Sequence, residues 1–512
     1  MSNQNLFVAL RDAFPAELDG VAVETADTTA PLLYTWRDLE RGSAMIANLL
    51  DSLELPPASR VAVQVDKSVE ALMLYLAVLR AGHVYLPLNN AYQAAELEYF
   101  IGNAEPAVVV CPKASFGWLS KLAFQAGVRH VFTLNDDRSG SLLDRAAFHA
   151  DTHEPARCAS DDLAAILYTS GTTGRSKGAM LTHGNLLSNA RVLKDYWGWR
   201  PGDVLIHALP IFHVHGLFVA SHGALLNGSR MIWFSKFDPR ATIERLPEAT
   251  VFMGVPTLYV RMLAEPSLTR EACRNMRLFI SGSAPLQVET FDAWRERTGH
   301  TILERYGMSE TVMLTSNPYH AKDGERVRGT VGYPLPGVEL RVRDEHGRDC
   351  APGEIGGIEV RGPNVFKGYW RMPEKTKEEF TDDGWFRTGD VGRRDADGRV
   401  TIVGRSKDLI ISGGYNVYPA EIEGYLNEMP GVAESAVVGV PHPDFGEGVI
   451  AVVVPRPGAT LDAAAIVGTL KTKIANFKVP KRVFIERELP RNAMGKVQKN
   501  LLRDAHKALF AA

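Results

Sequence analysis

Cysteines are few in this chain, and long hydrophobic runs are missing. The four cysteines, Cys111, Cys158, Cys273 and Cys350, lie far apart, and no pair has the spacing of metal ligands or of a redox motif. We therefore expect reduced thiols and a cytoplasmic location. The most apolar stretch, residues 71–81, is much shorter than the roughly 20 residues that a membrane span needs. It predicts a buried helix and no membrane partner.

A surplus of basic charge is also missing. Lysine and arginine together number 57, aspartate and glutamate number 60, and the formal net charge is -3. Nucleic-acid-binding proteins usually have a clustered excess of positive charge, so we expect no nucleic-acid partner. The N-terminal residues lack the basic start and the apolar core of a signal peptide. Composition leaves the oligomeric state open.

The chain does contain short apolar runs that alternate with longer helical patterns. A strand-like run at 61–65 precedes a helical pattern at 69–80, and a further strand-like run follows at 84–86. Runs at 107–110 and 278–281 continue this rhythm. Alternating strands and helices indicate an α/β fold with mostly parallel sheets. Because 512 residues exceed what one hydrophobic core usually organises, we expect at least two domains.

The pattern changes after about residue 329. Short strand-like runs punctuated by glycine, such as 338–342, predict a β-rich part at about 330–404. An α+β pattern follows it. We therefore predict a large N-terminal domain, 1–404, built from α/β subdomains and this β-rich part, and a small α+β C-terminal domain, 405–512.

One segment, 168–178 with the sequence YTSGTTGRSKG, has the composition of a phosphate-binding loop. Its glycines let backbone N–H groups converge on an anion, its hydroxyls add donors, and Lys177 adds a positive charge. It is not a Walker A motif, because a glycine follows Lys177 where that motif has serine or threonine. A surface turn is the alternative, but such turns seldom have this length and order. The segment therefore predicts a polyphosphate site.

Together with five further motifs, this loop resembles the acyl-adenylate-forming superfamily, which includes acyl-CoA synthetases, luciferases and nonribosomal-peptide adenylation domains. The motifs are SGSAP at 281–285, ERYGMSE at 304–310, WFRTGD at 385–390, GRSKD at 404–408 and PRNAMGK at 490–496. Each is weak alone, but all of them in the family's order are very improbable by chance. The resemblance covers nearly the whole chain. It implies small-molecule partners only: ATP with Mg²⁺, CoA and a carboxylic acid.

The resemblance also implies an ATP site. Thr172 and Thr173 would hold the β- and γ-phosphates, Asp390 would accept hydrogen bonds from both ribose hydroxyls, and Arg405 would contact the ribose and phosphate. Ser283, Ala284 and Pro285 would frame the adenine with Tyr306. The expected nucleotide-binding residues are Thr169, Ser170, Gly171, Thr172, Thr173, Gly174, Lys177, Ser283, Ala284, Pro285, Glu304, Arg305, Tyr306, Gly307, Met308, Ser309, Asp390 and Arg405.

Three residues are expected to act in catalysis by the same resemblance. Lys496 would bridge the acid's carboxylate and the α-phosphate, where a preorganised cation is worth roughly 10²–10³-fold in rate. Glu310, with Thr172, would bind Mg²⁺, which prefers oxygen ligands. His213 would gate the acid and CoA paths. The structural alternatives are a solvated tail lysine, a helix-capping glutamate and a core histidine, and the shared motifs favour function.

The two half-reactions need different groups at one adenylate. In the family the C-terminal domain rotates between them about a hinge that Lys407 matches here. Ser412, Gly413 and Gly414 would then line the route of the CoA thiol, since adjacent glycines permit close backbone approach. An ordinary turn is the alternative for these glycines. No thiol-carrier domain is visible in the sequence, so we expect free CoA to be the acceptor.

For the acid, the chain is most similar to the malonyl-CoA synthetases. The cues are FHVHG at 212–216, Arg261, the Glu304–Arg305 pair and TSNP at 315–318. The expected acid-binding residues are His213, Arg261, Ser283 and Arg305. In that group an arginine at the position of Arg261 binds the distal carboxylate, and Arg305 would help to orient it.

Other interpretations remain open at this point. Arg261 is in a helical pattern, and a surface helix arginine is the alternative to its expected role in the acid pocket. The acid could be methylmalonate, acetate or an aryl acid, and a luciferase-type oxygenase would share the adenylation step. A non-catalytic nucleotide-binding protein is the third class, against which the intact phosphate loop and Lys496 argue.

Overall fold

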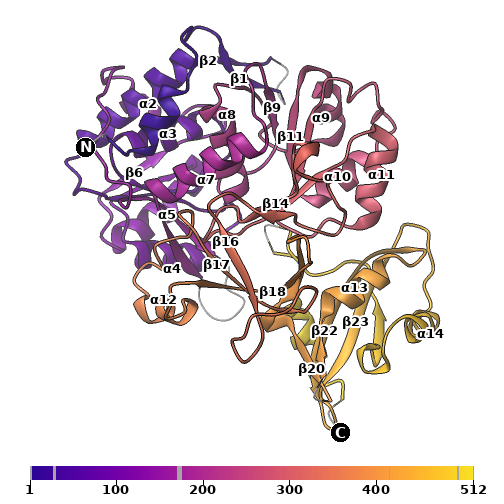
Figure 1. Cartoon of the computed structure of the whole chain (residues 1–512). Helices are drawn as coiled ribbons and strands as arrows, with labels where there is room; N and C mark the ends of the chain where they lie inside the picture. Colours follow the sequence, from indigo (N-terminus) through magenta and orange to yellow (C-terminus); the bar gives the residue numbers. More distant parts are fainter. Residues whose placement is uncertain (1–2, 27–29, 170–175, 414, 493–494, 511–512) are drawn as a thin grey trace. The chain divides into compact units, whose positions relative to one another are not determined.

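The computed structural model separates into two compact units, coloured along the chain in Figure 1. Unit 1 comprises Met1–Glu339 and Arg361–Phe386, and unit 2 comprises Leu340–Val360 and Arg387–Ala512. The residues that the structure describes are 3–26, 30–169, 176–413, 415–492 and 495–510. The predicted boundary between residues 404 and 405 separates a domain expected to rotate from the rest of the chain. A division into compact units does not test such a rotation, so this boundary stays a prediction.

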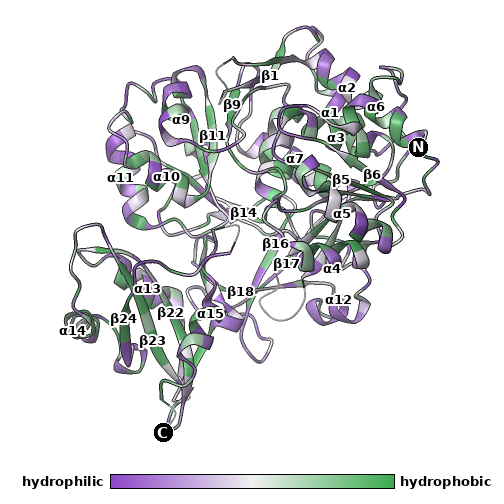
Figure 2. Ribbon diagram, turned by 180° about the vertical axis from the view of Figure 1, so that it is seen from behind, coloured by the Kyte–Doolittle hydropathy of each residue, from purple (hydrophilic) through white to green (hydrophobic). Residues whose placement is uncertain are grey.

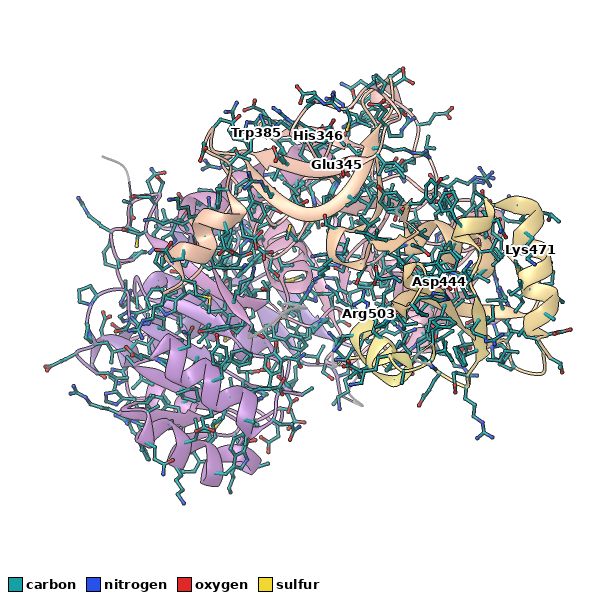
Figure 3. The ribbon with its side chains drawn as sticks, turned by 90° about the horizontal axis from the view of Figure 1, so that it is seen from below. Glu345, His346, Trp385, Asp444, Lys471 and Arg503 are labelled. Atoms are coloured by element: carbon teal, nitrogen blue, oxygen red, sulfur yellow. The ribbon has the colours of Figure 1, made fainter. Side chains whose placement is uncertain are left out.

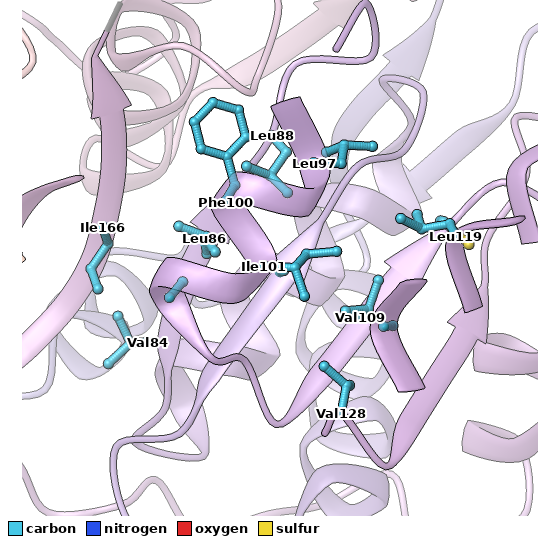
Figure 4. Packing of buried hydrophobic residues seen from close by; sticks show 14 residues of the cluster. Val84, Leu86, Leu88, Leu97, Phe100, Ile101, Val109, Leu119, Val128 and Ile166 are labelled. Carbon is cyan, nitrogen blue, oxygen red and sulfur yellow. The ribbon is translucent and has the colours of Figure 1, made fainter. Parts of the chain in front are cut away.

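A six-stranded sheet forms one part of unit 1. Its order is β6 (His130–Thr133), β5 (Val108–Cys111), β3 (Arg60–Val63), β4 (Val84–Pro87), β7 (Leu163–Thr169) and β8 (Lys177–Thr182). The pairs from β6 to β7 are parallel, and β8 runs antiparallel to β7. The strands are apolar nearly throughout because parallel sheets are covered on both faces. Figure 4 shows Phe100 and Ile101 packed over this sheet.

A nine-stranded sheet forms the other part of unit 1. Its order is β15 (Tyr333–Pro334), β14 (Thr315–Ser316), β13 (Leu303–Tyr306), β12 (Leu278–Ser281), β11 (Val251–Gly254), β9 (Val204–His207), β10 (Arg230–Trp233), β1 (Val21–Thr25) and β2 (Leu33–Thr35). The central strands from β13 to β1 are parallel, whereas β2, β14 and β15 pair antiparallel at the ends. The predicted α/β class with mostly parallel sheets is confirmed.

Unit 1 also contains helices. They are α1 (Leu6–Asp12), α2 (Trp36–Asp51), α3 (Val69–Arg80), α4 (Ala94–Ala104), α5 (Lys113–Gln125), α6 (Ser141–Ala146), α7 (His183–Tyr196), the π-helix η1 (His215–Ser221), α8 (His222–Leu226), α9 (Pro239–Arg245), α10 (Pro256–Leu263), α11 (Val288–Thr298) and α12 (Pro373–Glu379). Helix α3 begins after Ser68, whose side chain accepts a hydrogen bond from the Ala71 N–H. Every residue of α3 is buried, as its apolar sequence predicts.

The described residues of unit 2 form two mainly antiparallel sheets and three α-helices. The first sheet has β16 (Glu339–Arg343), β17 (Gly356–Arg361), β18 (Phe386–Arg394) and β19 (Val400–Arg405). The second has β21 (Tyr415–Val417), β20 (Ile410–Ser412), β23 (Gly446–Pro455) and β22 (Val432–His442), with β24 (Arg482–Ile485) parallel to β23. The helices are α13 (Pro419–Asn427), α14 (Ala463–Lys473) and α15 (Lys499–His506). Strands β22 and β23 are largely hydrophobic (green in Figure 2), which matches the α+β pattern read from the sequence.

Within the part of the chain that the structure describes, no helix combines the length and the apolar character needed to cross a membrane.

Replacing Ile101 by alanine tests the core of the six-stranded sheet. Ile101 is fully buried between α4 and the sheet, so Ile101→Ala leaves a cavity. We expect a loss of about 2–5 kcal/mol in the free energy of unfolding, against about 0.5–1.5 kcal/mol for the smaller Ile101→Val. Denaturant unfolding of both variants measures this difference. Equal stability of the two variants would contradict the packing described here.

Candidate active site

The expected site segments follow neighbouring strands of the nine-stranded sheet. Strands β9, β11, β12 and β13 are adjacent and parallel, so their carboxyl ends meet at one edge. The FHVHG segment follows β9, Arg261 lies in α10 after β11, SGSAP begins with the last residue of β12, and ERYGMSE begins in β13. In open α/β sheets, ligands bind at the carboxyl ends of strands. The topology therefore brings segments together that lie about 100 residues apart in the sequence.

Arg305, in β13, is a buried cation at this edge. Its side chain is 2% exposed, and its Nε and Nη2 groups have no hydrogen-bond acceptor among the described residues. The guanidinium lies against Gly282, where a Cβ atom would come within 2.4 Å of Cζ and displace it. Burial lowers the pKa of Arg305 to about 9. A buried guanidinium with unused donors is costly unless an anion pairs with it, so this position is suited to an anionic ligand.

Glu304 precedes Arg305 and points to the other face of the strand. Its Oε1 accepts a hydrogen bond of 2.9 Å from the Leu286 N–H, and its Oε2 is buried without a partner in the described part of the chain. Burial raises the pKa of Glu304 to about 8, against the opposing effects of the Leu286 N–H and Arg305. Its carboxyl is therefore mostly protonated at neutral pH. The bond to Leu286 holds the segment that contains Ser283, Ala284 and Pro285.

Ser283 and two histidines form a polar group near Arg305. Ser283 has a φ of 70°, a left-handed conformation that is strained for a residue other than glycine and is often found at functional sites. Its Oγ lies 3.3 Å from His215 Nδ1. His215 is buried, and burial together with Arg305, His213 and His207 holds its pKa well below the usual value. His213 is half-buried, and its Nδ1 accepts a hydrogen bond of 3.2 Å from the His215 N–H.

Arg261 differs from Arg305 in its surroundings. It lies on the exposed side of α10, and no hydrogen bond or ion pair joins its guanidinium to the described residues. The structure thus has one buried arginine within β13 and one exposed arginine in the helix that follows β11. The role expected for Arg261 stays a prediction.

Glu310 has a buried carboxylate that is held by Tyr369. The Tyr369 hydroxyl donates a hydrogen bond of 2.9 Å to Glu310 Oε1. The same ring lies beneath Lys177, whose Nζ is 4.2 Å from the ring centroid and forms an ion pair of 3.0 Å with Glu379. Tyr369 therefore joins the expected metal ligand to the lysine of the phosphate loop. Sequence analysis missed Tyr369, because only the fold brings it beside Glu310.

The rest of the expected ATP site in unit 1 is only partly described. Ser170, Gly171, Thr172, Thr173 and Gly174 lie outside the described residues. Thr169 ends β7 and Tyr306 ends β13, while Gly307, Met308 and Ser309 lead from β13 to Glu310.

Metal binding at Glu310 would follow the pattern of Mg²⁺ sites. No cluster of three His, Cys, Asp or Glu side chains that could hold a metal alone occurs among the described residues. A single buried carboxylate fits Mg²⁺, which usually takes one or two protein carboxylates and completes its shell with substrate phosphates and water.

Unit 2 contains the remaining expected residues. Asp390 in β18 is buried and forms an ion pair of 2.6 Å with Arg405 in the neighbouring strand. Lys407 lies in a short 3₁₀ turn after β19, and the adjacent Asp408 pairs with Arg503 (labelled in Figure 3) at 2.5 Å.

The CoA-route residues and Lys496 also lie in unit 2. Ser412 is buried at the end of β20, the Gly413 N–H donates to the Phe445 carbonyl at 2.9 Å, and Gly414 is outside the described residues. Lys496 has an exposed side chain, and its backbone is fixed by two hydrogen bonds with Asn492, of 2.9 and 3.0 Å.

A pH-dependent stability should result from Glu304. The pKa is about 8 in the folded chain and 4.5 for an unperturbed glutamate. Between these values the folded chain binds one proton more than the unfolded chain, so stability falls as the pH rises from about 4.5 to about 8. Glu304→Gln keeps a carbonyl oxygen for the Leu286 N–H but cannot ionise. We expect wild type to lose on the order of 1 kcal/mol per pH unit more than the variant across this window. Denaturant unfolding at several pH values measures both slopes, and equal slopes would contradict the raised pKa.

Comparisons with known proteins agree with the motifs. A family model described as AMP-binding enzyme matches residues 19–370, and one described as AMP-binding enzyme C-terminal domain matches residues 421–496. The chain is 36% identical over 477 residues to a malonate–CoA ligase of Arabidopsis thaliana, which covers 87% of this chain and 78% of the relative. It is 35% identical over 475 residues to a feruloyl-CoA synthase of Amycolatopsis sp, with 92% and 93% covered. The crystal structure of ATP-bound MatB from Rhodopseudomonas palustris is similar with a TM-score of 0.96 and 54% identity, over 99% of this chain and 100% of that chain. The chain, whose larger part the first model matches, therefore belongs to the AMP-binding enzyme family, as its motifs predicted.

Proposed function

We propose that this enzyme is an ATP-dependent malonate–CoA ligase. Malonate would attack the α-phosphate of ATP to give malonyl-adenylate and pyrophosphate, and the CoA thiol would then displace AMP to give malonyl-CoA. The observation that supports this choice of acid is the buried guanidinium of Arg305, whose donor nitrogens Nε and Nη2 have no acceptor among the described residues. The names of relatives such as the Arabidopsis malonate–CoA ligase point the same way.

The charge of the substrate explains the choice of a dicarboxylate. One carboxylate of malonate reacts, and the other must be neutralised in a buried place. A guanidinium pairs with a carboxylate through two parallel hydrogen bonds of fixed geometry. With acetate the same arginine would stay unpaired at a cost of about 2–5 kcal/mol, so it selects malonate and also rejects monocarboxylates.

The first half-reaction would use the residues that the family resemblance assigns to adenylation. Lys496 would neutralise the charge that builds on the α-phosphoryl oxygens, and Asp390, ion-paired with Arg405, would accept hydrogen bonds from the ribose hydroxyls. Mg²⁺, when bound with the nucleotide, would neutralise the leaving pyrophosphate. Glu310, with Thr172, would hold that ion, and Tyr369 would fix the direction of the Glu310 carboxylate.

The second half-reaction would require the C-terminal domain to turn about Lys407. The loop of Ser412, Gly413 and Gly414 would then line the path of the CoA thiol, and His213 would separate this path from the acid. A cytoplasmic location is part of the proposal, supported by the four free cysteines. Malonyl-CoA formed there would serve fatty acid metabolism.

The test is CoA-dependent release of AMP and pyrophosphate from ATP with malonate, methylmalonate, acetate, benzoate, ferulate and a fatty acid. We expect turnover with malonate, with methylmalonate behind it. Turnover only with a monocarboxylate or an aryl acid would keep the ligase and overturn the dicarboxylate specificity. No turnover with any acid would overturn the proposed reaction.

Removing the Lys496 side chain should abolish adenylation. Lys496→Ala eliminates the cation at the α-phosphate, so malonate-dependent exchange of pyrophosphate into ATP should fall by roughly 10²–10³-fold or more. ATP binding, measured by calorimetry, should change little. The matched control is Lys507→Ala, which removes an exposed lysine of the same C-terminal segment. Near-normal exchange in the Lys496 variant would contradict its assigned role.

The two arginines should differ in their effect on specificity. Arg305→Met removes the buried charge and should lower kcat/KM for malonate by roughly 30- to several-thousand-fold, with a much smaller loss for acetate. Arg261→Ala should also lower the malonate-to-acetate ratio if Arg261 contacts the distal carboxylate. Measuring kcat/KM for malonate and for acetate in both variants gives the two specificity ratios. An unchanged ratio in Arg305→Met would refute selection by the buried arginine, and an unchanged ratio in Arg261→Ala would make that residue a surface arginine.

A further inference from the structure

Lys67 and His207 form a buried polar pair that lies outside every motif described above. Lys67 lies in the loop between β3 and α3, and His207 is the last residue of β9. Lys67 Nζ lies 2.9 Å from His207 Nδ1 and donates to the carbonyl oxygens of His207, at 2.8 Å, and Phe234, at 2.7 Å. It also lies 4.3 Å from the ring centroid of Trp233. One ammonium group thus joins the loop after a strand of the six-stranded sheet to the carboxyl end of a strand of the nine-stranded sheet.

The ammonium determines which nitrogen of His207 bears the ring proton. A lysine ammonium has three donors and no acceptor, so His207 Nδ1 must accept and the proton must be on Nε2. Burial, followed by the charge of Lys67, holds the pKa of His207 well below its usual value, which keeps the ring neutral. Nε2 lies 3.0 Å from the carbonyl oxygen of Gly216 and 3.0 Å from Ser221 Oγ. The Nε2–H group therefore points into the turn that these two residues form.

That turn is the π-helix η1 (His215–Ser221). π-Helices are rare and frequent at functional sites. Ser221 Oγ donates to the Gly216 carbonyl at 3.0 Å, beside the bond from His207. Gly216 itself is tightly enclosed, because a Cβ atom there would lie 2.0 Å from the Pro210 carbonyl oxygen. The first residue of the π-helix is His215, which contacts both Ser283 and His213.

We propose that Lys67 is a positioning residue for the acid-binding site. By fixing the tautomer of His207, it anchors the first turn of η1. It thereby places His213, His215 and Ser283 beside Arg305. The inference rests on the proposed function in so far as those residues form the acid site. A lysine that only ties the two sheets together would affect stability and leave acid recognition unchanged.

Lys67→Met is the central variant, since methionine keeps the length and burial of the side chain but cannot donate. We expect KM for malonate to rise about tenfold or more, with KM for ATP changed by less than about twofold. Hydrogen–deuterium exchange of the segment 209–221 should become faster. The control is Lys194→Met, which removes another lysine of unit 1 that donates to a backbone carbonyl, that of Leu226. It should change neither the KM for malonate nor the exchange of 209–221.

Two variants of His207 distinguish the effect of its Nε2–H donor from the effect of its packing. Gln can place an N–H near the position of Nε2 and preserve the donor to Gly216, whereas Asn reaches only the position of Nδ1. We expect His207→Gln to keep a KM for malonate near that of wild type and His207→Asn to resemble Lys67→Met. Equal loss of thermal stability in all three variants, with KM for malonate unchanged, would overturn the positioning role.

The exchange measurement distinguishes this inference from the proposed function. If wild type activates no acid of the panel, the proposed ligase reaction fails. In that case hydrogen–deuterium exchange of Lys67→Met still tests whether Lys67 positions η1. Unchanged exchange of the segment 209–221 would overturn the inference. If wild type activates a different acid, KM for that acid replaces KM for malonate in the same comparison.

Discussion

The parallel pairing of β9, β11, β12 and β13 is the constraint on which the site in unit 1 depends. Parallel strands end at the same edge, so each of the four loops that follow them opens there. The register of β12 and β13 pairs Ser281 with Glu304, which puts Gly282 next to Arg305. Because Gly282 lacks a Cβ, the guanidinium lies against its backbone. A change in this register would separate the arginine from the serine and histidine segments.

Two adjacent residues of β13 have different tasks. Arg305 supplies a buried positive charge, and Glu304 holds the neighbouring segment through its bond to Leu286. Arg305 and Glu304 point to opposite faces, and both are buried. Burial disfavours the charged form of each, but with different results. Glu304 is mostly protonated at neutral pH and acts through its bond to Leu286, whereas Arg305, with its pKa near 9, stays mostly charged. The unmatched charge is therefore the positive one, which suits an anionic substrate.

The supports of Glu310 and His207 come from distant parts of unit 1. Tyr369 is 59 residues from Glu310 and orients its carboxylate. Lys67 is 140 residues from His207 and sets the direction of its ring proton. Neither support belongs to the motif that it serves. In each case a hydrogen bond to a buried donor fixes a side chain or a turn that would otherwise have alternative arrangements.

The sequence by itself determined the family, the α/β class and most element positions, because these depend on local patterns and ordered motifs. Helix 69–80 and the strands near 107–110 and 278–281 occur where their apolar periodicity predicts them. Tertiary structure alone decided that Arg305 is buried and Arg261 exposed, since both are arginines in apolar surroundings in the sequence. It also decided the contacts of Tyr369 and Lys67, whose partners lie far along the chain. Burial and long-range hydrogen bonds depend on how sheets and helices pack, and no local pattern encodes that packing.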